Sequence, residues 1–162
     1  MKALTLWRPW PWAIFWGGCR PKRIENRPWR PWPSIIGQTI ALHAGKTFDK
    51  SAVDFIIDNT RLEGEPRVLA AEASLEGIIG LATVRGCVDN ALDAAGEAGQ
   101  GQESWFFGPF GWVLDDVRRL DKPVAIKGAQ GLWDVPAWAL KEINERTLIK
   151  APSDTFEGAH GF

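Results

Sequence analysis

Tryptophan and proline crowd the start of this chain. Six of its ten tryptophans lie within residues 1–32, in the run LTLWRPWPWAIFWGGCRPKRIENRPWRPW. Because proline interrupts helices and strands, this stretch can form only short elements. A large aromatic side chain usually stabilises a protein by being buried, so we expect most of the ten tryptophans to pack in a core. The others are available to contact a ligand.

The same stretch is strongly basic. Residues 1–32 carry seven basic side chains and one acidic one, whereas the rest of the chain carries 12 basic and 19 acidic side chains. A chain of nearly zero net charge is therefore polarised along its length. Flat aromatic faces and guanidinium groups suit stacked bases and phosphates. The composition makes nucleic acid, or a nucleotide, the first partner to consider.

The bulk composition is that of one globular domain. A chain of 162 residues is long enough to bury a core, and we expect the domain over residues 1–150 and a flexible tail over 151–162. Two cysteines and two histidines match no disulfide framework or zinc motif, so we expect no metal and no cofactor. No membrane-spanning run or secretion signal is visible, which predicts a cytoplasmic protein with no membrane partner. The oligomeric state is left open.

Short elements follow one another along the chain. The pattern predicts strands over residues 3–6, 22–27, 39–44, 78–88, 111–117 and 123–127, the last two joined by a turn near 120–122. Helices are expected over 12–16 and 51–60 and from Pro136, with Trp138, Ile143 and Leu148 on the buried side of the last. Residues 68–76 are either helix or loop, and the acidic, glycine-rich stretch 89–103 predicts a mobile loop. Five or six short strands with a few flanking helices indicate an α+β fold built on a small mixed β-barrel.

The motifs resemble those of one family over nearly the whole chain, to about Leu148. The runs LTLWRPWPWAIFWGG, KRIENR and TIALHAGK, followed by GIIGLATVRGCV and SWFFGPFGWVLDDVRRLDKPVAIKGAQGLWDVP, resemble an ASCH domain. The resemblance implies a PUA-like barrel with a cleft for RNA or a modified base. Different members are linked to RNA binding, ribonuclease activity or amide hydrolysis on an acetylated cytidine. A binding module and a small metal-independent hydrolase therefore both stay open.

A lysine, a glutamate and an arginine of the family pattern match Lys22, Glu25 and Arg27. Strand alternation places Glu25 and Arg27 on one face, and Lys22 joins them only if Pro21 turns the chain. Arg27 can hold a phosphate, and a lysine beside another cation can act as a base or nucleophile. The alternative is a structural Glu25–Arg27 pair beside a solvated Lys22. Amidohydrolase members carry a threonine where this chain has Glu25, which argues against deacetylation.

The remaining candidates are spread along the chain. The resemblance places Ser104 near the cleft, so the candidate catalytic residues are Lys22, Glu25 and Ser104, although Ser104 is equally a capping residue. The candidate nucleic-acid-binding residues are Arg8, Arg27, Trp29, Trp32, Lys46 and Lys127. Trp29 and Trp32 lie in a proline-rich loop and either stack on bases or wedge beneath the loop. Lys46 and Lys127 either contact a phosphate or are simply solvated.

Other aromatic residues are assigned to the interior or left undecided. Trp7 and Trp16 are assigned to the core, while Trp10 and Trp12 are either core or stacking residues. His43 ends an apolar strand, which favours a buried histidine with satisfied nitrogens over a general base. A third function also stays open, in which the tryptophan-rich end contacts a partner protein.

Overall fold

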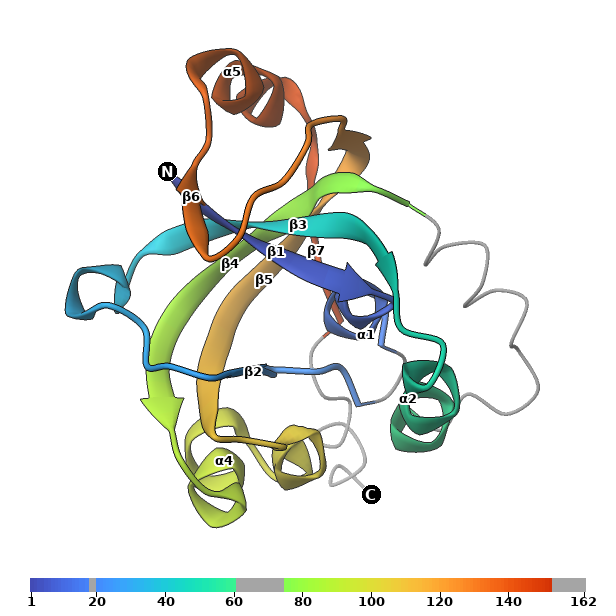
Figure 1. The fold of residues 1–162 in the computed structure, drawn as a ribbon, viewed down its shortest axis with the longest axis vertical. Helices are drawn as coiled ribbons and strands as arrows, with labels where there is room; N and C mark the ends of the chain where they lie inside the picture. Colours follow the sequence, from blue (N-terminus) through green and yellow to red (C-terminus); the bar gives the residue numbers. More distant parts are fainter. Residues whose placement is uncertain (18–19, 61–74, 153–162) are drawn as a thin grey trace, which may run out of the picture.

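A computed structural model describes residues 1–17, 20–60 and 75–152 (Figure 1). Within these residues seven strands form one mixed sheet in the order β2-β5-β4-β3-β1-β6, with β7 pairing to β5. The strands are β1 (Lys2–Arg8), β2 (Ile24–Arg27), β3 (Thr39–Phe48), β4 (Gly77–Val88), β5 (Phe110–Val124), β6 (Leu132–Asp134) and β7 (Leu148–Lys150). The helices are α1 (Trp10–Phe15), α2 (Ala52–Thr60), α4 (Ala91–Ala98) and α5 (Ala137–Glu145), with short 3₁₀ turns at Pro33–Ile35 and Gln102–Trp105.

The α+β class is confirmed, and the sheet is open rather than a closed barrel. β2 and β6 stand at the two ends of the strand order, and no ladder joins them in the described part of the chain. β1 and β3 pair in parallel, whereas the other pairs are antiparallel. In Figure 1, α5 lies at one end of the molecule beyond β6, and α2 and α4 lie at the opposite end.

Alternation along the neighbouring strands β1 and β3 decides which of their side chains reach the core. Leu4 and Leu6 of β1, with Leu42 and Ala44 of β3, belong to the largest buried cluster, into which α1 also inserts Phe15. The intervening residues must then point to the opposite face of the sheet. Thr5 and His43 are such residues, and the parallel register places them side by side.

Helix α5 covers only part of that opposite face. Its buried residues Ala139 and Ile143 pack with Ala3 of β1 and Ala41 of β3. Trp138 is exposed, and Leu148 is 38% exposed on β7, so two of the three predicted buried positions are wrong. The spacing of four between Ala139 and Ile143 defines the buried stripe, and Trp138 falls outside it. The uncovered part of the face is where the hollows described below open.

Two segments fold differently from the prediction. Residues 89–103 are not a loop, because α4 and a 3₁₀ turn occupy most of them. The Asn90 side chain caps α4 by accepting a hydrogen bond from the Asp93 amide (2.8 Å), and Ala94 is fully buried. The turn near 120–122 is also absent, since β5 continues through it. Pairing with β7 on one edge and β4 on the other keeps that segment extended.

Two predicted segments extend beyond what the structure describes. Of the tail predicted over 151–162, the structure describes only Ala151 and Pro152, and residues 153–162 lie outside the described residues. Of the segment 68–76, which was predicted as helix or loop, it describes only residues 75 and 76, and residues 68–74 lie outside the described residues. Ala151 is buried in the main core cluster. None of the described helices is long and apolar enough to span a membrane.

β4 carries bulges at its glycines, and glycine within a strand is typical of a bulge. The β4–β5 register shifts between Ile78 and Gly80 and again between Val84 and Gly86. Gly80 lies against the next strand and α1, because a Cβ added there would stand 2.4 Å from the Arg118 carbonyl oxygen and 2.4 Å from Phe15. At Gly86 an added Cβ would meet nothing within 4 Å.

We expect Gly80→Ala to lower the free energy of unfolding by about 1–3 kcal/mol, because the methyl group overpacks the contact between β4, β5 and α1. Gly86→Ala, on the same strand, is the matched control and should change stability by less than about 0.5 kcal/mol. Urea unfolding of both variants measures the difference. Equal stabilities would contradict the close packing at Gly80.

Candidate functional site

Two adjoining hollows open on the face of the sheet that α5 leaves uncovered. We name them the Arg27 hollow, of about 530 Å³, and the His43 hollow, of about 280 Å³. They share Thr5, Ala129 and Gln130, so the connection between β5 and β6 forms a ridge between them. The Arg27 hollow is lined by Thr5, Leu6, Trp7, Trp10, Glu25, Asn26, Arg27, Trp29 and residues 129–131. Its volume is that of a small-ligand site.

Three charged residues converge at the Arg27 hollow. The Lys22 backbone amide donates to the Ala13 carbonyl (2.9 Å), which turns the chain from α1 into β2. The Lys22 ammonium then donates to the Ile24 carbonyl and to Glu25 Oε2, at 2.9 Å from the latter. Glu25 Oε1 lies 3.9 Å from a terminal nitrogen of Arg27. Lys22 is only 2% exposed, so it is part of this cluster and is not solvated.

Tryptophan rings support these cations. The Lys22 Nζ lies 5.7 Å from the centre of the Trp10 ring, and the Arg27 Cζ lies 5.3 Å from that of Trp29. The Arg27 Nε is buried and has no hydrogen-bond partner among the described residues. A buried donor without a partner is uncommon in a folded protein. The guanidinium therefore keeps hydrogen-bonding capacity that no described residue uses.

Trp7 is not a core residue, contrary to the prediction. It is 60% exposed and lines the Arg27 hollow beside Trp29, which is 43% exposed. The burial of Leu4 and Leu6 requires this, because alternation turns Trp7 to the same face as Thr5. Trp12 is buried in a second core cluster, against which Trp16 packs half-buried.

Four of the predicted site residues line neither hollow: Lys22, which reaches the Arg27 hollow only through Glu25, and Ser104, Trp32 and Arg8. The Ser104 hydroxyl donates to the Gly101 carbonyl (2.8 Å), within a 3₁₀ turn. Trp32 is 48% exposed, with the Lys2 ammonium 5.7 Å from its ring centre. Arg8 donates to the Gly45 carbonyl (2.8 Å) and pairs with Glu76 (3.3 Å). Their predicted roles in binding or catalysis stay predictions.

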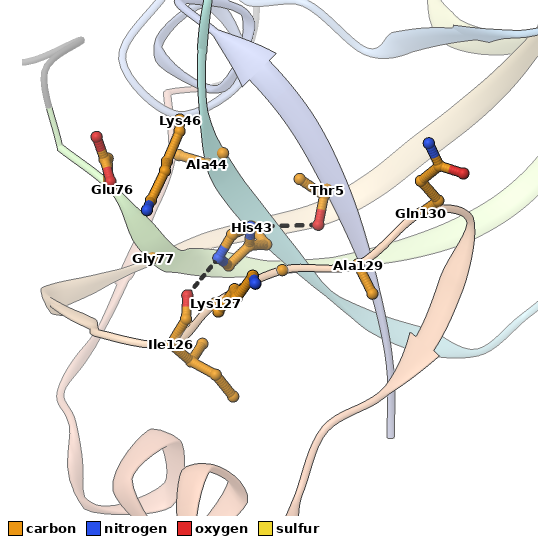
Figure 2. Close-up of a pocket in the computed structure, with 12 residues that line it drawn as sticks. Thr5, His43, Ala44, Lys46, Glu76, Gly77, Ile126, Lys127, Ala129 and Gln130 are labelled. Carbon is orange, nitrogen blue, oxygen red and sulfur yellow. Dashed lines mark hydrogen bonds between the residues drawn. The ribbon is translucent and has the colours of Figure 1, made fainter.

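His43 is hydrogen-bonded to Thr5 of β1 and to Ile126 of the β5–β6 connection, as Figure 2 shows. Its Nε2 lies 2.7 Å from the Ile126 carbonyl oxygen, which can only accept, so Nε2 carries the proton. Nδ1 then accepts from the Thr5 hydroxyl (3.2 Å), and Thr5 Oγ1 itself accepts from the Trp133 indole (3.0 Å). Both nitrogens are satisfied, which is the arrangement that the sequence favoured. Lys46 and Lys127, also predicted from sequence, line this hollow.

A glycine lets the ridge approach the histidine. A Cβ added to Gly128 would stand 2.4 Å from Thr5 Oγ1 and 2.6 Å from His43 Nδ1. The absence of a side chain at Gly128, directly after Lys127, therefore allows the backbone of the β5–β6 connection to lie against the Thr5–His43 hydrogen bond. No cluster of three or more His, Cys, Asp or Glu side chains that could hold a metal ion occurs in the described residues.

Solved structures with the same architecture identify the fold. Two mutant forms of the protein ZmASCH from Zymomonas mobilis, one with serine changed to alanine and one with tyrosine changed to phenylalanine, superpose with TM-scores of 0.51 and 0.50. Their sequences are 14% and 15% identical to this one. Each superposition covers 90% of this chain, and it covers 96% and 98% of the respective ZmASCH chains. The chain has an ASCH-like fold. No protein-family model and no curated protein matches the sequence.

Within this ASCH-like domain, sequence reasoning missed two kinds of site residue. Thr5 and Trp7 line the hollows, and the alternation of Leu4 and Leu6 was the signal that could have placed them there. Asn26 carried no such signal. Its side-chain oxygen accepts from the amides of Phe107 (2.7 Å) and Gly108 (3.1 Å), so it positions the segment that precedes β5.

Burial lowers the pKa of His43 from its ordinary value of 6.5, and the hydrogen bond to Ile126 and the charge of Glu76 oppose that shift only in part. The folded protein therefore keeps His43 neutral at pH values where the unfolded chain takes up a proton. Stability is retained above pH 6.5 and is lost as the pH falls below it. We expect the free energy of unfolding to decline between about pH 7.5 and 5.5, and to decline less in His43→Gln.

Denaturant titrations of the wild type and of His43→Gln at several pH values in this range measure how steeply the free energy of unfolding of each protein depends on pH. Subtracting one pH dependence from the other cancels the contribution of the carboxylates that both proteins share. Parallel slopes would show that His43 does not titrate differently in the folded and unfolded states.

Proposed function

We propose that this ASCH-like domain binds RNA or another single-stranded nucleic acid and takes one base in the Arg27 hollow. The observation that carries the proposal is the lining of that hollow, which combines exposed faces of Trp7 and Trp29 with the Glu25–Arg27 pair. The basic, tryptophan-rich first 32 residues supply most of this lining. The fold shared with ASCH structures agrees with such a partner.

Each lining group has a part in holding a nucleotide. Stacking on an exposed tryptophan contributes roughly 1–3 kcal/mol per base and tolerates any base. The Arg27 guanidinium donates to a phosphate or a base carbonyl, and the Glu25 carboxylate accepts from an exocyclic amino group. Lys22 holds Glu25 in place through its 2.9 Å contact and partly offsets the repulsion between the carboxylate and phosphate.

A metal-independent hydrolase acting on RNA or a nucleoside is the second candidate. The buried Lys22–Glu25 pair beside the hollow favours it, since acid–base chemistry needs such groups. Two features favour binding instead. The Lys22 nitrogen already donates to a backbone carbonyl and a carboxylate, and the Ser104 hydroxyl is bonded within its own turn. In this arrangement Lys22 positions Glu25.

We expect binding of single-stranded oligonucleotides to weaken as salt rises, because phosphate contacts release counterions. Arg27→Ala should weaken binding by about 1–3 kcal/mol through loss of a charge-assisted contact. Fluorescence titration at several salt concentrations measures both effects. Arg30→Ala is the matched control, since Arg30 pairs with Asp89 (3.3 Å) outside both hollows.

The two arginine variants separate a binding role from a structural one. If Arg27→Ala lowers the melting temperature and leaves affinity unchanged, the Glu25–Arg27 pair is structural. A flat salt dependence, or no binding at low salt, would refute the nucleic-acid proposal itself.

Lys22→Arg distinguishes binding from hydrolysis. The guanidinium keeps the positive charge beside Glu25 but does not deprotonate, so it cannot serve as base or nucleophile. For a binding module we expect no turnover by the wild type on a panel of RNA oligomers and N4-acetylcytidine, and less than about a threefold change in affinity in the variant. Wild-type turnover that is abolished in Lys22→Arg, with binding and melting temperature retained, would establish the hydrolase.

A further inference from the structure

The His43 hollow is not used when a single base lies in the Arg27 hollow. The His43 hollow adjoins the Arg27 hollow across Thr5, Ala129 and Gln130, and the two open on the same face of the sheet. Ala129 and Gln130 are exposed on the ridge, with a small side chain at one position and a hydrogen-bonding amide at the other. A bound strand that leaves one hollow can therefore enter the next by crossing only these two residues.

The charges that line the His43 hollow are mostly unpaired. The carboxylate that lines this hollow, Glu76, forms an ion pair with Arg8 at 3.3 Å. Lys46 of β3 and Lys127 of the β5–β6 connection are both exposed, and neither has a carboxylate within 4.0 Å among the described residues (Figure 2). The hollow thus presents two available ammonium groups beside walls of small and apolar residues, among them Ala44, Gly45 and Ile126.

We propose that the His43 hollow is a second nucleotide subsite. The nucleotide that precedes the base in the Arg27 hollow lies here, and Lys46 and Lys127 contact its 5′-phosphate. The linking phosphodiester crosses the ridge, where the Gln130 amide can donate to it. This inference rests on the proposed function and sharpens it, because it makes the ligand an oligonucleotide of at least two residues and not a free nucleoside.

The experiment compares 5′-phosphorylated mononucleotides with the corresponding dinucleotides for each of the four bases, as 2′-O-methyl ribonucleotides that resist cleavage. Isothermal titration at one low salt concentration gives the ratio of the two affinities. We expect the wild type to bind the preferred dinucleotide roughly tenfold or more tightly than the mononucleotide, through added stacking and phosphate contacts. Lys46→Gln/Lys127→Gln should reduce that ratio to about twofold or less.

Lys122→Gln/Lys141→Gln is the matched control. It removes the same charge from two lysines that line neither hollow, and it should keep the wild-type ratio. Equal affinities for mononucleotide and dinucleotide in the wild type, or an advantage of the dinucleotide that survives Lys46→Gln/Lys127→Gln, would overturn the second subsite while leaving the first. Failure to bind any of the nucleotides would refute the proposed function and the subsite together.

Discussion

The face of the sheet that carries both hollows depends on one chain of hydrogen bonds. Trp133 donates to Thr5, Thr5 donates to His43, and His43 donates to the Ile126 carbonyl. These four residues come from β6, β1, β3 and the β5–β6 connection, so the hydrogen bonds join that connection to three strands. Burial of the histidine lowers its pKa, while its hydrogen bond to Ile126 opposes that shift. These hydrogen bonds, together with the β1–β6 ladder, hold the ridge between the two hollows in place.

A buried ion pair sets the chemistry of the larger hollow. Lys22 and Glu25 are 2% and 7% exposed, and burial of such a pair costs desolvation energy that the attraction between the charges does not reliably offset. Breaking it by removing one partner is strongly destabilising, because an uncompensated charge is left inside. The pair is therefore a costly way to stabilise a fold, and its position beside Arg27 and two tryptophans agrees with a role in recognition.

Local patterns were read correctly where the chain's own neighbours decide the structure. The strand before Arg8, the helix at Pro11, the strand ending at Arg27 and the bulges of β4 all follow from proline, glycine and apolar spacing. The errors occur where distant segments decide. Residues 118–120 pair with β7, which keeps β5 extended where a turn was predicted, and residues 91–98 form a helix with Ala94 buried in a core cluster.

The sequence by itself determined an α+β domain with a basic, aromatic end, and it singled out Lys22, Glu25 and Arg27 as a possible cluster. That cluster came from the resemblance to the ASCH pattern, because period-two alternation by itself places only Glu25 and Arg27 on one face. Only the tertiary structure decided that Lys46 and Lys127 lie in one hollow and that Ser104 lies apart from both. The reason is that strand order and the β5–β6 connection join residues far apart in the chain, and no local spacing encodes that pairing.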